Sequence, residues 1–186
     1  MFWAEYTNAN SIRKIGEAFQ AEIAAPTQMQ DFRTDDMYYL KAEDNAPAFA
    51  RSTYPAYHFR LTTRDMARFG YLFLRGGNWN GKQLLPADWV RESTTSYSKT
   101  TGFGEGFGYG YLWWMRGYGL KLDVFSARGA LGKYVVVIPD RDWVVAFANH
   151  TEFPDGPQAA SAAEVKELPD VPVPAMSKLL TLLLAA

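Results

Sequence analysis

The 186-residue chain contains no cysteine. That absence excludes disulfide bonds, thiolate metal sites and a cysteine nucleophile. Imidazole is nearly as scarce, because His58 and His150 are the only histidines and their spacing pairs them with nothing. A zinc site needs three or four converging ligands. No such spacing is present, so the sequence predicts no metal and no cofactor.

Blocks of like charge and long apolar runs are missing as well. The 19 basic and 20 acidic residues give a net charge of −1, so we expect no nucleic-acid partner, because phosphate binding needs clustered Lys and Arg. The apolar stretch at residues 179–186 is far shorter than the roughly 20 residues of a membrane span. No basic segment followed by an apolar run, the pattern of a signal peptide, is visible at the start. Periplasmic, secreted and cytoplasmic locations all stay open.

What the chain does contain is apolar residues, 48% of the total, which is enough for one domain with a packed core. The clearest local pattern lies at residues 134–147, where two β-branched runs flank Pro139-Asp140-Arg141-Asp142. Pro presets a turn and Asp bonds back to it, so this segment predicts a β-hairpin. Gly129 and Gly132 precede it and allow another group to approach the backbone closely.

Helical periodicity marks the rest of the chain. In residues 10–25, Ile12, Ile15, Phe19 and Ile23 define one apolar face. Thr62 and Asp65 resemble a capping box at the start of a helix over 61–75. Further helices are expected at 86–93 and 175–184, and strands at 107–115 and 120–126. This order predicts an α+β fold with an antiparallel sheet of three to five strands flanked by helices.

Five segments in this order resemble one known family. They are residues 22–32, 61–70, 76–82, 109–114 and 125–149. The resemblance is to the serine β-lactamase and penicillin-binding-protein superfamily, in its class C-like and esterase-like branch. A complete domain of that family is considerably longer. The resemblance therefore implies that residues 1–186 form a single domain like the C-terminal half of a β-lactamase-like serine hydrolase, an incomplete version of the fold.

In that family an active-site Ser attacks a carbonyl, and a Lys three residues later activates it. A Tyr-x-Asn element assists proton transfer, and a Lys-Thr-Gly or His-x-Gly strand borders the substrate. The resemblance implies hydrolysis of a small ester, amide or β-lactam through an acyl-enzyme, in a protein of bacterial origin. Segments missing from an incomplete fold would leave apolar surface, which an oligomer or a missing N-terminal segment would cover.

Two segments near the start match the catalytic patterns. Ser11-Ile12-Arg13-Lys14 matches Ser-x-x-Lys, and Tyr6-Thr7-Asn8 matches Tyr-x-Asn, but in the reverse of the family's order. Lys14 lies about 140° around the helix from the apolar face, where an amine keeps an ordinary pKa and is a poor base. The sequence therefore favours a chain that lacks its own nucleophile and is inactive alone. A compact enzyme using Ser11 and Lys14 and a non-catalytic binding module are the alternatives. Tyr6 is a catalytic candidate through its match to Tyr-x-Asn, but its position favours a packing residue.

Ala127-Arg128-Gly129 occupies the place of the family's Lys-Thr-Gly strand. Ala127 replaces the basic residue, and Gly129 keeps the open backbone that a substrate needs. Arg128 either offers a cation to a carboxylate or is an ordinary surface residue. A second Ser-x-x-Lys match, at residues 96–99, lies in a Ser- and Thr-rich stretch that we interpret as solvated loop.

Overall fold

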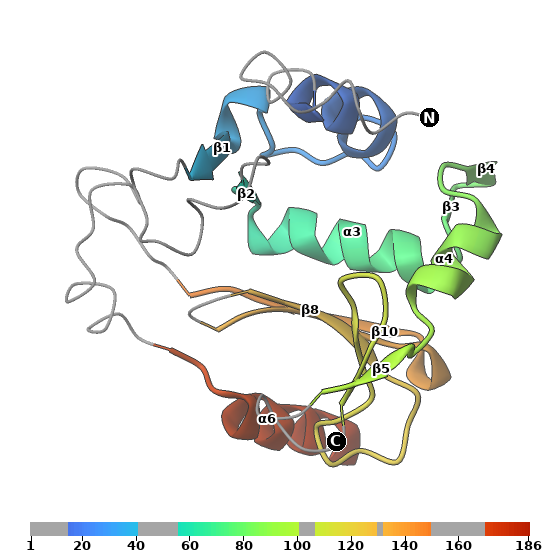
Figure 1. Ribbon diagram of the computed structural model, residues 1–186, viewed down its shortest axis with the longest axis vertical. Helices are drawn as coiled ribbons and strands as arrows, with labels where there is room; N and C mark the ends of the chain where they lie inside the picture. The colour runs from blue at the N-terminus through green and yellow to red at the C-terminus, as the bar shows by residue number, and fades with distance from the viewer. Residues whose placement is uncertain (1–14, 41–55, 101–106, 130–131, 150–169) are drawn as a thin grey trace.

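The computed structural model describes residues 15–40, 56–100, 107–129, 132–149 and 170–186. The described chain forms layers, which follow one another in Figure 1 as an N-terminal region, helix α3, a sheet and helix α6. The sheet is antiparallel and lies between the two helices. The α+β class expected from the sequence is confirmed.

The sheet has six strands in the order β10-β9-β8-β7-β6-β5. Their bounds are β5 Ser98–Lys99, β6 Gly108–Tyr109, β7 Trp114–Met115, β8 Phe125–Gly129, β9 Lys133–Ile138 and β10 Trp143–Phe147. The number of strands exceeds the expected three to five. One reason is that the segment predicted as one strand, residues 107–115, forms two strands, β6 and β7, joined by a turn. Leu112 has a φ of 65°, and the Gly110 N–H donates to the Trp113 carbonyl at 2.8 Å. Residues 98–99, interpreted as solvated loop, pair with β6.

The predicted hairpin is confirmed. Strands β9 and β10 pair from Ile138↔Trp143 to Tyr134↔Phe147. The turn is a short 3-10 helix, Pro139–Arg141, closed by Asp142 in the left-handed region with a φ of 56°. Proline at its first position has no N–H to leave unpaired, and aspartate tolerates the left-handed conformation.

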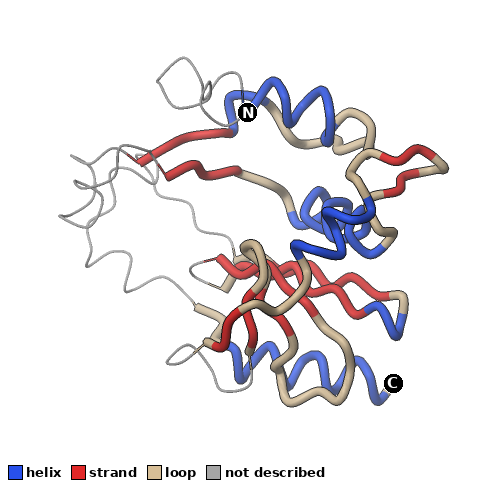
Figure 2. Tube along the Cα trace, turned by 45° about the vertical axis from the view of Figure 1, so that its right-hand side comes forward, coloured by secondary structure: helices blue, strands red, loops and turns tan. Residues whose placement is uncertain are grey.

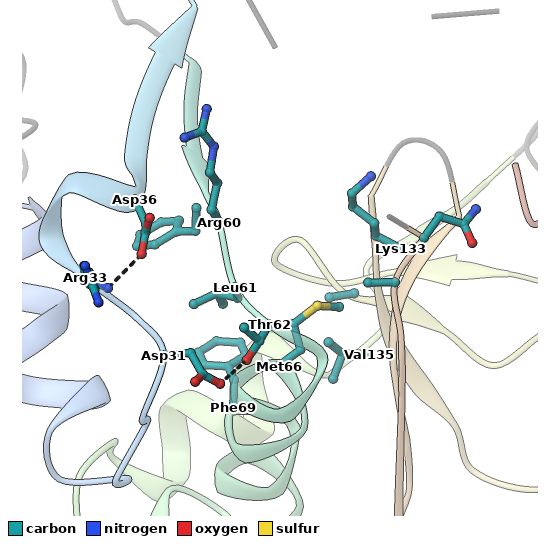
Figure 3. A pocket seen from close by; sticks show the side chains of 14 residues that line it. Asp31, Arg33, Asp36, Arg60, Leu61, Thr62, Met66, Phe69, Lys133 and Val135 are labelled. Carbon is teal, nitrogen blue, oxygen red and sulfur yellow. Dashed lines mark hydrogen bonds between the residues drawn. The ribbon is translucent and has the colours of Figure 1, made fainter. Parts of the chain in front are cut away.

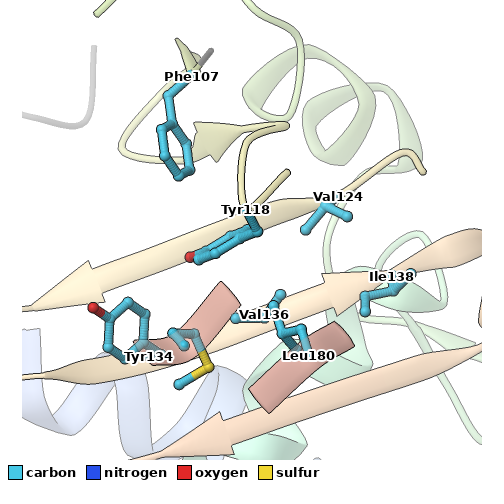
Figure 4. Packing of buried hydrophobic residues seen from close by; sticks show 8 residues of the cluster. Phe107, Tyr118, Val124, Tyr134, Val136, Ile138 and Leu180 are labelled. Carbon is cyan, nitrogen blue, oxygen red and sulfur yellow. The ribbon is translucent and has the colours of Figure 1, made fainter. Parts of the chain in front are cut away.

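Alternation along β9 divides the core between the two faces of the sheet. Val135 and Val137 belong to a buried cluster with Phe73 of α3, which spans Thr63–Leu74. Val136 and Ile138 belong to the opposite cluster, with Leu180 of α6, which spans Val173–Ala185 (Figure 4). The strand is therefore buried on both sides, as its continuous β-branched run requires.

Helix α3, Thr63–Leu74, lies within the predicted range of 61–75. The Thr62 side chain accepts the Asp65 backbone N–H at 3.3 Å, which is half of the expected capping box. Beyond the helix, Gly76 and Gly77 adopt positive φ values of 60° and 83°. A short ribbon of β3 Asn78–Trp79 and β4 Lys82–Gln83 and the helix α4 Ala87–Ser93 follow.

The N-terminal region lies on the side of α3 away from the sheet (Figure 2). Its helix is described from residue 15 and continues as the π-helix Gln20–Ala24. A 3-10 turn, Thr34–Asp36, leads into a ribbon of β1 Met37–Leu40 and β2 Ala56–Phe59. In the described part of this region, a buried cluster contains Ala24, Phe32 and Met37.

Helix α6 confirms the predicted C-terminal helix and shows apolar residues on both faces. Met176 and Leu180 are buried against the sheet, whereas Leu179, Leu182 and Leu183 are exposed. In the described part of the chain, no helix combines the length and apolar character needed to cross a membrane.

Candidate functional site

A pocket of about 750 Å³ opens between the N-terminal region and the sheet. Asp31, Arg33, Asp36 and residues 59–62 line one side, and Met66 and Phe69 of α3 lie at its base (Figure 3). The other side, the sheet side, consists of Ala127 on β8, Lys133 and Val135 on β9, and Ala148 and Asn149 after β10. Leu61, Met66, Phe69, Ala127 and Val135 make most of this lining apolar, which suits the body of a small organic molecule.

A buried carboxylate fixes the N-terminal side of the pocket. Asp65 has no exposed surface. Its oxygens accept the backbone N–H groups of Gln30 at 3.2 Å and of Asp31 and Phe32 at 3.1 Å each. Arg68 adds an ion pair at 3.3 Å. A buried charge is tolerated only when it is paired and hydrogen-bonded, and these four interactions meet that need.

Asp31 is held as an anion at the start of α3. The Thr62 hydroxyl donates to its Oδ2 at 2.8 Å, and the Arg64 guanidinium lies 3.2 Å away. The Thr62 hydrogen bond lowers the pKa of Asp31; desolvation opposes that effect and the Arg64 charge supports it. An anionic carboxylate at a helix N-terminus is also favoured by the helix dipole. Asp31 is therefore unsuited to donate a proton near neutral pH.

Asp36 is engaged in a similar way, since its Oδ2 accepts the Arg33 backbone N–H at 3.0 Å. Basic side chains face the pocket from both sides. Arg60 rises from the N-terminal side and Lys133 from the sheet side, so that the two flank the open end in Figure 3. Burial lowers the pKa of Lys133, and the Asp170 charge acts in the opposite direction.

The three substrate-strand residues predicted from the sequence fall on different sides of β8. Ala127 lines the pocket. Arg128 points to the other face, where its guanidinium carbon lies 4.5 Å from the Trp114 ring centroid and 5.0 Å from that of Phe107. Gly129 is exposed and pairs with Lys133. The substrate-binding roles of all three stay predictions.

The catalytic candidates Tyr6, Ser11 and Lys14 lie outside the described residues. Among the described residues that line the pocket there is no serine, and the only hydroxyl is that of Thr62, which donates to Asp31. Within the same described ranges, His, Asp and Glu residues form no group of three or more that would hold a metal ion.

Sequence reasoning missed three residues that shape the pocket, namely Asp31, Asp65 and Lys133. Asp65 was interpreted as a local helix cap, and nothing local signals its bonds to residues 30–32. The position of Lys133 could have been predicted from the sequence. The predicted hairpin and the alternation along its first strand place Lys133 on the same face as Val135.

The sequence profile of the Beta-lactamase family matches residues 10–168. An uncharacterized protein of Alkalihalophilus pseudofirmus is 31% identical over 75 residues, which are 40% of this chain and 20% of that protein.

Two solved structures are also similar. A Bacillus anthracis protein, whose assignment as a 6-aminohexanoate-dimer hydrolase is itself provisional, shares 26% identity with a TM-score of 0.39, covering 50% of this chain and 24% of its own. The octameric penicillin-binding protein homologue from Pyrococcus abyssi shares 18% identity with a TM-score of 0.47, over 70% of this chain and 32% of its own. The matched chain thus spans between about a fifth and a third of the length of these relatives.

Proposed function

Since this chain belongs to the beta-lactamase family, we propose that it takes part in serine-dependent hydrolysis of a small ester, amide or β-lactam. In the acyl-enzyme route the serine oxygen attacks the carbonyl, a base takes its proton, and the alcohol or amine leaves with a proton. Water then releases the acid and restores the serine. The family match supports the hydrolase scaffold, and the reaction itself is the proposal.

The observation that carries the proposal is the position of Ala127 in the wall of a pocket large enough for such a substrate. Strand β8 also has backbone groups in a suitable place. Its ladder with β7 ends at Ser126↔Trp114 in the described residues, whereas its ladder with β9 continues to Gly129. We propose that the β7 side of residues 127–129 receives an extended substrate, as an added strand would.

We further propose that the described residues supply the substrate wall and not the attacking group. None of the described residues that line the pocket is a serine. Of the described serines, Ser126 is buried and accepts the Tyr118 hydroxyl at 2.9 Å, and Ser93 is buried and donates to the Val90 carbonyl. The chain alone is then expected to bind a substrate without turning it over.

Active-site labelling tests this proposal. The purified chain is incubated with a fluorophosphonate probe, p-nitrophenyl esters and nitrocefin, and we expect no labelled serine and no burst. Labelling of Ser11, abolished in Ser11→Ala together with hydrolysis, would instead establish the compact enzyme. The reading frame upstream of Met1 is then expressed together with the chain. An in-frame Ser-x-x-Lys whose serine takes the probe supports the hydrolase, and a longer product that takes no probe and hydrolyses nothing contradicts it.

The second candidate is a non-catalytic binding module on the same scaffold. The mostly apolar pocket, with no serine among its described lining residues, favours it. Binding of benzylpenicillin or peptidoglycan fragments without turnover, in both the chain and any longer product, would support the module over the hydrolase.

A further inference from the structure

An exposed row of aromatic side chains lies apart from the pocket. The row consists of Trp89 on α4, Tyr97 before β5 and Tyr111 in the turn between β6 and β7. The centroid of the Tyr111 ring lies 5.6 Å from that of Trp89 and 5.2 Å from that of Tyr97. The three side chains are 42%, 57% and 42% exposed in the order Trp89, Tyr97 and Tyr111. Single exposed apolar residues are ordinary, but a contiguous group of them points to an interaction site.

The aromatic row belongs to a different part of the molecule from the pocket. Helix α4 lies at the far end of α3 from strand β2 in Figure 1, and none of the three rings is among the residues that line the pocket. A role for the row is therefore separate from the hydrolysis proposed for the pocket.

Close backbone contacts hold the row in place. The Tyr111 N–H donates to the carbonyl of Ser93, the last residue of α4, at 2.9 Å. Gly110 permits this approach, because a Cβ added there would lie 2.7 Å from the Thr95 carbonyl oxygen. The row is thus formed before a ligand arrives, so that little ordering opposes binding.

The turn that carries Tyr111 is strained. Leu112 has a φ of 65°, a conformation that leucine rarely adopts, and its side chain is 79% exposed. At that exposure its side chain gains little packing in return. Backbone strain of this kind gathers at functional sites. The turn therefore presents apolar side chains at the surface at a cost that packing does not offset.

Charges around the row are balanced. Asp88 and Arg91 pair with each other at 2.7 Å. Glu92 and Lys99 are the other charged residues of the described segments 87–100 and 107–113, and they are opposite in sign. Neither an anionic nor a cationic partner is favoured by such a surface. Nucleic acid, which needs an excess of Lys and Arg, is disfavoured for the same reason.

A polar group borders the rings. The Tyr111 hydroxyl donates to Glu92 Oε1 at 2.9 Å. This hydrogen bond, with help from desolvation, raises the pKa of Tyr111 to about 12. Tyr111 therefore stays a neutral donor near pH 7. A carboxylate accepts more than one hydrogen bond, so Glu92 has capacity for a hydroxyl of a ligand.

We propose that the aromatic row binds a neutral oligosaccharide. A sugar ring has an apolar face of C–H groups and a rim of hydroxyls, and aromatic side chains with a polar neighbour match both parts. The C–H face packs on the row and the hydroxyls bond to Glu92. This site goes beyond the proposed hydrolysis and does not depend on it.

The stacking of the rings argues against a proline-rich peptide, which docks into grooves lined by aromatic rings. The planes of Tyr97 and Tyr111 are inclined by only 16°, with the centroids 5.2 Å apart. That spacing leaves no slot between the two rings for a proline side chain. The row offers an outer surface instead, which a sugar ring covers.

The test is calorimetric titration of the full chain with cellohexaose, chitohexaose and maltohexaose, three neutral hexasaccharides that differ in linkage and substituents. We expect at least one of them to bind. Trp89→Ala and Tyr97→Ala should each weaken that binding about tenfold, as loss of one aromatic contact predicts, and Trp89→Phe should keep most of it. Trp143→Ala is the matched control, since Trp143 on β10 is 38% exposed and lies outside the row.

No binding of any of the three sugars, or equal affinity in the unmodified chain, Trp89→Ala and Tyr97→Ala, would overturn the inference. Phosphatidylcholine vesicles and a decaproline peptide are titrated in parallel. Binding of either that requires Trp89, without sugar binding, would assign the row to a lipid surface or a proline-rich peptide and reject the oligosaccharide.

Circular dichroism verifies that each variant is folded, and the two alanine variants lie on different segments, so that either one alone gives a decision. Serine labelling is measured separately. Sugar binding without a labelled serine would uphold the aromatic row and leave the hydrolase unsupported, and labelling without sugar binding would do the reverse.

Discussion

The two sides of the pocket are held in place by different kinds of interaction. The sheet side is continuous with the core, since Val135 lines the pocket and belongs to the buried cluster beneath α3. In the described part of the N-terminal side, three buried apolar residues form a cluster, and the backbone at residues 30–32 is attached to α3 through Asp65. Apolar packing is non-directional, whereas hydrogen bonds fix direction and distance. The sheet side is therefore held mainly by packing, whereas the N-terminal side also depends on the hydrogen bonds and ion pairs that Asp65 and Asp31 make with residues across its junction with α3.

The largest expected effect comes from Asp65→Ala. It leaves three backbone N–H groups without their acceptor and Arg68 without its ion pair. Breaking a buried charge pair costs about 3–5 kcal/mol. We therefore expect the free energy of local opening at residues 30–32, measured by amide hydrogen exchange, to fall by that amount. The loss should stay within the N-terminal region and the start of α3, with the sheet still protected.

Asp88→Ala is the matched control for this variant. Asp88 lies in α4, and its ion pair with Arg91 is largely exposed. Such pairs contribute about 0–1 kcal/mol, so protection at residues 30–32 should not change. Equal protection of those residues in Asp65→Ala and Asp88→Ala would mean that apolar packing holds both sides of the pocket, and the contrast would disappear.

Leu180→Ala tests the packed side. Leu180 is fully buried between α6 and the sheet. Truncation to alanine removes apolar contacts and leaves a cavity, which costs about 3 kcal/mol. Urea unfolding followed by circular dichroism should show this loss as one cooperative transition of the sheet. Leu179, the residue before Leu180, is 37% exposed and serves as the control. Leu179→Ala should lower the free energy of unfolding by less than about 1 kcal/mol. Similar losses in the two variants would show that α6 contributes little packing to the sheet.

Gly70→Ala probes the contact between α3 and the sheet. An added Cβ would lie 2.6 Å from Val135 Cγ1 and 2.7 Å from Val144 Cγ1, so the helix or the strands must shift. Overpacking costs about 1–3 kcal/mol and alanine recovers up to about 1 kcal/mol of helix propensity, so we expect a net loss near 1–2 kcal/mol in urea unfolding. Val144→Ala in the same chain should restore part of the stability. A gain in stability from Gly70→Ala alone would show that the contact is loose.

The fold could be predicted where local residues determine it. The hairpin follows from β-branched runs around Pro139-Asp140-Arg141-Asp142, and α3 follows from its cap, its period and two terminal glycines. The strands β5, β6 and β7 were not individually predictable, because two residues carry no periodicity. Their pairing depends on the turn at Leu112, whose positive φ no sequence rule indicates for leucine.

The site was less predictable than the fold. The resemblance led to Ala127, which lines the pocket. It did not lead to Asp65, because the bonds of Asp65 reach back more than 30 residues and a Thr62–Asp65 pair already has a local explanation as a cap. For Arg128 the sequence left open a ligand role and a surface role, and the structure places its guanidinium on the other face of the sheet, over the Trp114 ring.

Thr62→Ala has the smallest expected effect and examines the junction of the two sides. Its hydroxyl accepts the Asp65 N–H and donates to Asp31, and loss of such a cap costs about 1 kcal/mol. Thr63→Ala, one residue later and exposed, should cost less.

The Thr62 bond is the largest influence that lowers the pKa of Asp31. A lowered carboxyl pKa stabilises the fold above its unfolded value and loses that effect as the pH falls through the lowered one. The deficit of Thr62→Ala in urea unfolding should therefore be larger near pH 7 than at about pH 3. If the loss of unfolding free energy in Thr62→Ala does not change with pH, Thr62 acts only as the helix cap. Its bond to Asp31 then adds nothing to the attachment of the N-terminal side, which depends on Asp65.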